Sequence, residues 1–159
     1  MPPSPQPLGQ DAIPLLSALH IGAGSVSLMI AERHPDGSIT PVDFLEKPVP
    51  IARDIFRSGT VNQATTEQVV AIIKIFQHSL VELGLDPHCV TRAVTTNILS
   101  EATNHETVMN RIRIACGLRV ATIDDGEMTR LIYLKTRRRL QHLPALREQT
   151  TLVVHVGPG

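Results

Sequence analysis

The sequence predicts an α/β fold, with a mixed five-stranded sheet and helices packed against it. Its 159 residues are enough for one domain with its own core. Apolar residues make up 42% of the chain and aromatic residues 3%, so the core is expected to be aliphatic. The segments read as three strands followed by helices that alternate with strands, which is typical of a mixed sheet.

The first three strands are expected to form a meander. An apolar run over residues 15–21 ends at glycines and indicates a buried strand. A turn at 22–25 leads into a second β-prone run over 26–32. The turn sequence at 35–37 then leads into a third strand from about Ser38 to Glu46.

The most regular helix is predicted from about Thr65 to Gly84. The hydroxyl groups of Thr65 and Thr66 before Glu67 are typical of a helix start. Apolar residues then recur at steps of three and four and make one face of a helix. This face comprises Val69, Ile72, Ile73, Phe76, Leu80 and Leu83.

The rest of the chain alternates between strands and helices. A helix whose apolar face includes Val108, Ile112 and Ala115 is predicted to stop at Gly117. The other predicted elements are strands over 90–94, 119–123 and 151–156 and a helix over about 126–139, the last strand running into glycines 157 and 159.

Composition excludes several classes of protein. Lysine plus arginine equal aspartate plus glutamate at 15 each, so no overall field attracts a membrane or a specific nucleic acid. The proline-rich segment 1–14 lacks the pattern of a secretory signal and is predicted to be a flexible tail before a domain over 15–159. Cys89 and Cys116 lack metal or redox spacing, and we expect buried thiols in a cytoplasmic protein.

Two predicted strands end in glycine-containing loops, at 20–25 and 155–159. Backbone N–H groups in such loops can converge on an anion. Spacing alone fits an ordinary hairpin turn equally well at the first loop. A dinucleotide site is excluded there because Ser27 opens a β-prone run where a small residue and a helix are required. The candidate phosphate-binding residues are Gly22, Ala23, Gly24, Ser25, Gly157 and Gly159.

Four segments resemble motifs of the exopolyphosphatase/guanosine pentaphosphate phosphatase (Ppx/GppA) family, in the same order. Residues 20–25 read HIGAGS beside DIGSNS, and 93–104 read AVTTNILSEATN beside AVATSALREAxN. Residues 124–133 read DDGEMTRLIY beside SGxEEARLIY, and 155–159 read HVGPG beside the start of DIGGGS. The resemblance runs from about Leu16 to the last residue and corresponds to the family's N-terminal lobe.

The resemblance implies an actin-like, ribonuclease H-like ATPase lobe. Members of the family hydrolyse terminal phosphates of polyphosphate or guanosine pentaphosphate between two lobes. Their sites use carboxylates that hold Mg²⁺, glycine loops that bind phosphate and an arginine that neutralises charge. The second lobe is expected to be absent here, and a homodimer is one way to cover the surface that it would occupy.

Several active-site positions of the family carry other residues. The aspartates of the two loops correspond to His20 and His155, and the arginine corresponds to Ser100. Imidazole is a poor ligand for Mg²⁺, so a normal magnesium site and full catalysis are not expected. One glutamate is kept as Glu127, while its neighbour is Met128. Glu127 is the candidate catalytic base, although a glutamate at a helix start also stabilises the helix dipole.

Alternatives remain for these residues. His20 and His155 could pair with phosphate or jointly bind Zn²⁺ or Ni²⁺, or they could simply end their strands, and no metal site is predicted. Basic residues within 135–139 could contact polyphosphate or RNA, or could form a solvated helix end. The sequence favours a catalytically impaired module that binds phosphate, polyphosphate or a partner. The alternatives are a vestigial lobe and a divergent exopolyphosphatase or guanosine pentaphosphate phosphohydrolase completed by another lobe or subunit.

Overall fold

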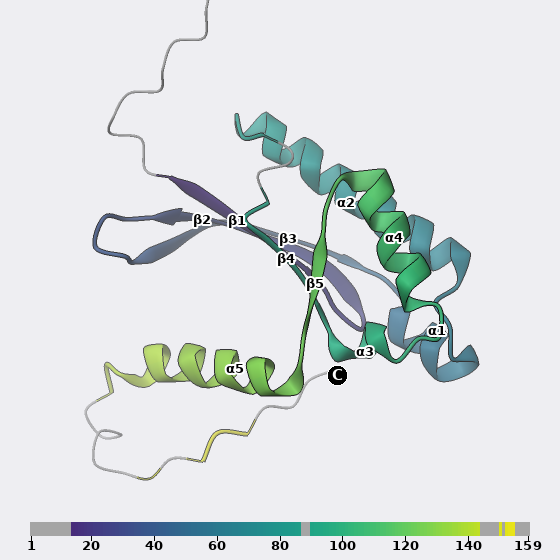
Figure 1. Cartoon of the computed structure of the whole chain (residues 1–159). Coiled ribbons are helices and arrows are strands. Elements are labelled where there is room, and N and C mark those ends of the chain that lie inside the picture. The colour runs from purple at the N-terminus through teal and green to yellow at the C-terminus, as the bar shows by residue number, and fades with distance from the viewer. Residues whose placement is uncertain (1–13, 87–89, 144–149, 151, 155–159) are drawn as a thin grey trace, which may run out of the picture.

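The computed structural model describes residues 14–86, 90–143, 150 and 152–154. Its helices and strands follow one another in a meander, a helical pair and two strand–helix units (Figure 1). In chain order they are β1 (Leu15–Ile21), β2 (Ser25–Arg33), β3 (Ile39–Pro48), α1 (Ile51–Ser58), α2 (Gln63–Glu82), β4 (Arg92–Thr96), α3 (Asn97–Ser100), α4 (His105–Cys116), β5 (Val120–Ile123) and α5 (Asp125–Leu140).

The five strands form one mixed sheet in the order β3-β2-β1-β4-β5. Strand β1 lies in the centre, antiparallel to β2 and parallel to β4. The outer pairs continue this pattern, with β3 antiparallel to β2 and β5 parallel to β4. The predicted α/β class and the mixed five-stranded sheet are therefore confirmed.

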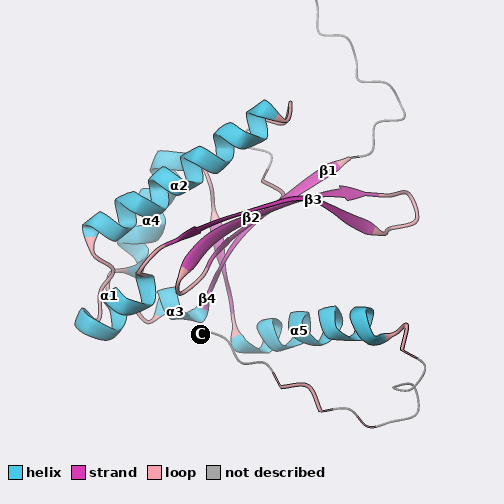
Figure 2. Cartoon of the chain, turned by 180° about the vertical axis from the view of Figure 1, so that it is seen from behind, coloured by secondary structure: helices cyan, strands magenta, loops and turns pink. Residues whose placement is uncertain are grey.

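One face of the sheet carries the core. Figure 2 shows α1, α2 and α4 on the same side of the strands. Alternate residues of β1 and β2 point toward these helices and are almost completely buried, as are the facing residues of α2. The central buried side chains are Leu19, Ile21, Val26, Leu28, Ile30, Ile73, Phe76 and Leu80.

Helix α5 lies on the opposite side of the sheet from α2 and α4 (Figures 1 and 2). None of its residues is buried, and Leu131, Tyr133 and Leu134 are exposed on it. No helix in the described part of the chain is long and apolar enough to cross a membrane.

The start of α2 differs from the prediction. The helix begins at Gln63, with Asn62 as its N-cap, and not near Thr65. The hydroxyl of Thr65 donates to the buried Asp54 carboxylate of α1, and the hydroxyl of Thr66 donates to the Asn62 carbonyl. Both threonines are therefore occupied inside the helix and do not cap it.

Three other predictions need correction. The short helices α1 and α3 were not predicted, because α1 has eight residues and α3 four, too few for an apolar pattern to repeat along the sequence. Strand β4 lies about two residues later than predicted. Within the predicted strand over 151–156, residues 152–154 are exposed and have no strand partner among the described residues. The remainder of that segment lies outside the described residues.

Asn104, at the start of α4, links the loop before α4 to the loop between α1 and α2. The Asn104 side-chain amide donates to the Val61 carbonyl at 2.8 Å, and its oxygen accepts the Val61 N–H at 3.0 Å. The neighbouring Thr103 N–H donates to the Gly59 carbonyl at 2.9 Å. Asn104 thus satisfies both backbone groups of Val61 with the donor and the acceptor of one side-chain amide.

We predict that Asn104→Ala lowers the free energy of unfolding by about 2 kcal/mol, because it leaves a part-buried N–H and C=O unpaired. Urea unfolding measures this loss. The exposed Asn97→Ala variant serves as a control and should change stability by less than about 0.5 kcal/mol. Equal losses in the two variants would contradict the role given to Asn104.

Candidate functional site

Those predicted site residues that the structure describes follow strands that end at one edge of the sheet. Strands β1, β4 and β5 are parallel, so their carboxyl ends lie at the same edge. The turn at 22–25 follows β1, α3 follows β4, and α5 follows β5. This is the edge at which open α/β sheets bind ligands.

The turn after β1 has its carbonyl groups tied to the start of α1. The Val49 N–H donates to the Gly24 carbonyl and the Ala52 N–H donates to the Ala23 carbonyl, both at 2.9 Å. The Gly22 N–H is used within the turn, at 2.8 Å from the Ser25 carbonyl. The N–H groups of Ala23 and Gly24 have no acceptor among the described residues, and Gly24 is exposed. Free donors without competing acceptors are what an anion requires.

The two glycines of this turn, Gly22 and Gly24, differ in the space that surrounds them. Neither has a positive φ, so backbone strain does not require glycine. A Cβ at Gly22 would lie 3.0 Å from His20 Cε1, and the imidazole therefore packs directly against the Gly22 backbone. A Cβ at Gly24 would meet nothing within 4 Å, so this position is open to larger side chains.

His20 places an imidazole beside the turn. Its ring lies on the sheet face opposite the core, next to Ser27 of β2. Its Nε2 atom is buried and has no hydrogen-bond partner among the described residues, and the same holds for Oγ1 of Thr96 at the end of β4. Buried polar atoms are nearly always paired, so water or a ligand is expected to reach these two.

Burial lowers the pKa of His20 below its ordinary value of 6.5, while the Glu46 carboxylate acts in the opposite direction. Glu46 lies across the sheet beyond Ser27 and accepts a hydrogen bond from the Ser25 hydroxyl at 2.7 Å. At neutral pH the His20 imidazole is therefore uncharged, with one N–H donor and one acceptor nitrogen.

This lowered pKa predicts a pH-dependent stability. The unfolded chain takes up a proton on His20 near pH 6.5, before the folded chain does, so stability falls as the pH drops through this value. Unfolding measured between about pH 7.5 and about pH 5.5 should show a smaller loss for His20→Gln than for the unchanged protein. His142→Gln, at an exposed histidine, is the control. Parallel profiles for His20→Gln and the unchanged protein would contradict this assignment.

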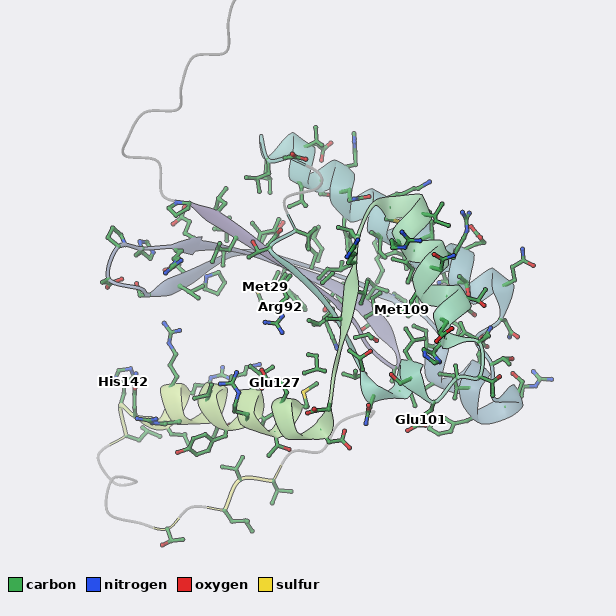
Figure 3. The ribbon with its side chains drawn as sticks, viewed as in Figure 1. Met29, Arg92, Glu101, Met109, Glu127 and His142 are labelled. Atoms are coloured by element: carbon green, nitrogen blue, oxygen red, sulfur yellow. The ribbon has the colours of Figure 1, made fainter. Side chains whose placement is uncertain are left out.

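Glu127 lies in the first turn of α5. Its N–H is capped by the Asp124 carboxylate at 2.7 Å. Its own carboxylate receives two hydrogen bonds from Arg130, at 2.7 and 2.8 Å. Hydrogen bonding from Arg130 lowers the pKa of Glu127, and Arg92 of β4, which points toward α5 in Figure 3, adds to this. A carboxylate held in its charged form is a weaker proton acceptor.

The described residues at this edge do not fit Mg²⁺. Magnesium prefers oxygen ligands in octahedral geometry, whereas His20 offers a nitrogen and Glu46 already accepts the Ser25 hydroxyl. Within the described part of the chain, no three His, Cys, Asp or Glu side chains are grouped in a way that could hold a metal ion.

The other predicted site residues are Ser100 and those of the second glycine loop. Ser100, at the family's arginine position, ends α3 and is exposed. His155, Gly157 and Gly159 lie outside the described residues, so the pairing of the two glycine loops stays a prediction. Sequence reasoning missed Thr96 and Glu46. Thr96 lies within a quoted motif, but only the register of β4 shows which face it occupies.

The fold and the site edge together define an actin-like α/β lobe. Comparison with solved structures supports this class: a Ppx/GppA protein of Aquifex aeolicus has a TM-score of 0.71 at 22% identity over 82% of the chain. An exopolyphosphatase of Cytophaga hutchinsonii has a TM-score of 0.68 at 18% identity. Exopolyphosphatase 1 of Mycobacterium tuberculosis is 24% identical over 77% of the chain.

These likenesses relate the chain to the N-terminal portion of the Ppx/GppA family. No family model matches the chain. The chain covers 35% of the mycobacterial exopolyphosphatase, 41% of the Aquifex protein and 40% of the Cytophaga protein. The relationship therefore concerns one portion of these proteins.

Proposed function

We propose that the protein is a phosphate- or polyphosphate-binding module of the Ppx/GppA type with impaired catalysis. The observation that carries this proposal is the turn after β1, whose Ala23 and Gly24 N–H groups lack acceptors among the described residues. The neutral imidazole of His20 lies against the same turn and brings no negative charge to it. N–H donors without an acceptor favour an anion, and the neighbouring Glu46 carboxylate already accepts the Ser25 hydroxyl.

Two features support impaired catalysis. The position of the family's first aspartate holds His20, which does not suit Mg²⁺. The Glu127 carboxylate accepts hydrogen bonds from Nε and Nη2 of Arg130, which lowers its pKa and its basicity. We place the protein in the cytoplasm, because a free thiol such as that of Cys116 stays reduced there.

A second candidate function is a divergent phosphohydrolase completed by another lobe or subunit. It is favoured by the relatives named exopolyphosphatase and by the retention of Glu127 at the start of α5. A homodimer that covers the surface which a second lobe would occupy also remains a prediction, and sedimentation of the purified chain measures it.

The binding proposal predicts that a negative charge at position 24 weakens binding, whereas a neutral side chain of the same shape does not. Gly24→Glu should weaken polyphosphate binding by about tenfold or more, because a carboxylate then stands beside the free N–H groups. Gly24→Gln has nearly the same shape and should bind within about threefold of the unchanged chain. Titration calorimetry with phosphate and with polyphosphate measures both. If both variants keep the affinity of the unchanged chain, or if none of these ligands gives heat on titration, the proposal is overturned and a vestigial lobe is favoured.

Impaired catalysis predicts little phosphate release. Phosphate release is measured from polyphosphate and from guanosine pentaphosphate, each with Mg²⁺ or Mn²⁺. The unchanged chain should release phosphate no faster than the Glu127→Gln variant does. Gln141→Ala, at the exposed C-cap of α5, controls for unspecific effects of changing this helix. Robust turnover that Glu127→Gln abolishes and Gln141→Ala retains would establish the phosphohydrolase instead.

A further inference from the structure

The two edges of the sheet differ in their capacity to accept another strand. The outer edge of β3 is obstructed, because Pro41 and Pro48 have no N–H and the Phe44 N–H is taken by the Asp43 carboxylate at 2.8 Å. Proteins protect edge strands in this way against unwanted pairing. At the other edge, β5 pairs only with β4 among the strands that the structure describes, and it contains no proline.

A groove lies beside the unprotected edge. It has a volume of about 470 Å³ and is lined by α4 and by the beginning of β5. Its apolar lining comes from Met109, Leu118 and Val120, of which Leu118 is buried (Figure 3 labels Met109). A strand edge next to an apolar depression is the arrangement that binds extended peptides by strand addition.

The charged lining of the groove is predominantly basic. Arg113 and Arg119 line it, against a single acid, Glu106. Arg113 donates a hydrogen bond to the neutral Asn110 side chain at 2.7 Å, and this contact does not neutralise its charge. Arg113 comes from α4 and Arg119 from the segment before β5, so the two cations border the apolar floor from different elements.

We propose that this groove binds an extended acidic peptide segment, which adds as a strand to β5. An apolar residue of the peptide sits over Met109 and Val120, and acidic residues two positions to either side face the arginines, because alternate residues of a strand share one face. A bare polyanion would use the arginines but neither the apolar floor nor the strand edge. The site is separate from the turn at 22–25, which does not line the groove.

The probe is the peptide acetyl-Ser-Glu-Thr-Leu-Thr-Glu-Ser-amide, titrated into the full chain. We expect saturable binding that weakens about tenfold or more in the double variant Arg113→Glu/Arg119→Glu. Arg137→Glu/Arg138→Glu on α5 has the same change of charge and should bind as the unchanged chain does. Hydrogen exchange should show new protection of backbone amides within β5.

Two altered peptides test the binding mode. Replacing the central leucine by proline removes a backbone donor and should abolish the protection of β5, and replacing both glutamates by lysine should abolish binding. No binding of the probe, or equal binding by the two double variants, would overturn the proposal. Binding of polyphosphate at the groove without binding of the peptide would also overturn the proposal, since the groove would then be an anion site. Folding of each variant is checked by its unfolding transition.

Discussion

Burial of one face of the sheet against α2 is the constraint on which the rest of the structure depends. Leu19 and Ile21 of β1 and alternate residues of β2 enter the aliphatic core, where Ile73 and Phe76 meet them. Because strand side chains alternate, a shift of β1 by one residue would expose this set to water. The hydrophobic effect, at about 25 cal/mol for each Å² of apolar surface buried, makes such a shift costly.

The same alternation determines the chemistry at the edge of the sheet. Since Leu19 and Ile21 face the helices, His20 faces the opposite side, in line with Ser27 and then Glu46. The parallel arrangement of β1 with β4 and β5 places the turn after β1 at the same edge as the start of α5. Burial of the apolar face thus determines that His20, Ser27 and Glu46 share the opposite face, although the core residues do not contact them.

Local patterns predicted the elements with strong periodicity and failed where structure depends on neighbours. The α2 face from Val69 to Leu80 and the end of α4 at Gly117 were predicted from apolar spacing and from a glycine, which in the structure has a φ of 71°. Leu83, assigned to the same face, lies after the end of α2 and is exposed. Helix α1 was missed, because its stability comes from packing and from the Asp54 bond to Thr65 of another helix. The residues of the turn were predicted, but the orphaned Thr96 hydroxyl depends on strand register, which no local pattern carries.

The histidine at the end of β1 changes what the neighbouring turn can bind. A carboxylate at position 20 would repel a phosphate from the adjacent N–H groups unless a cation lay between them. A neutral imidazole removes that repulsion, and with it the need for a metal ion that would also activate water for hydrolysis. The proposed binding without a metal and the proposed weak hydrolysis would both follow from this one substitution. Restoring the carboxylate by His20→Asp should weaken phosphate binding in the absence of metal, and titration of that variant with and without Mg²⁺ separates the two effects.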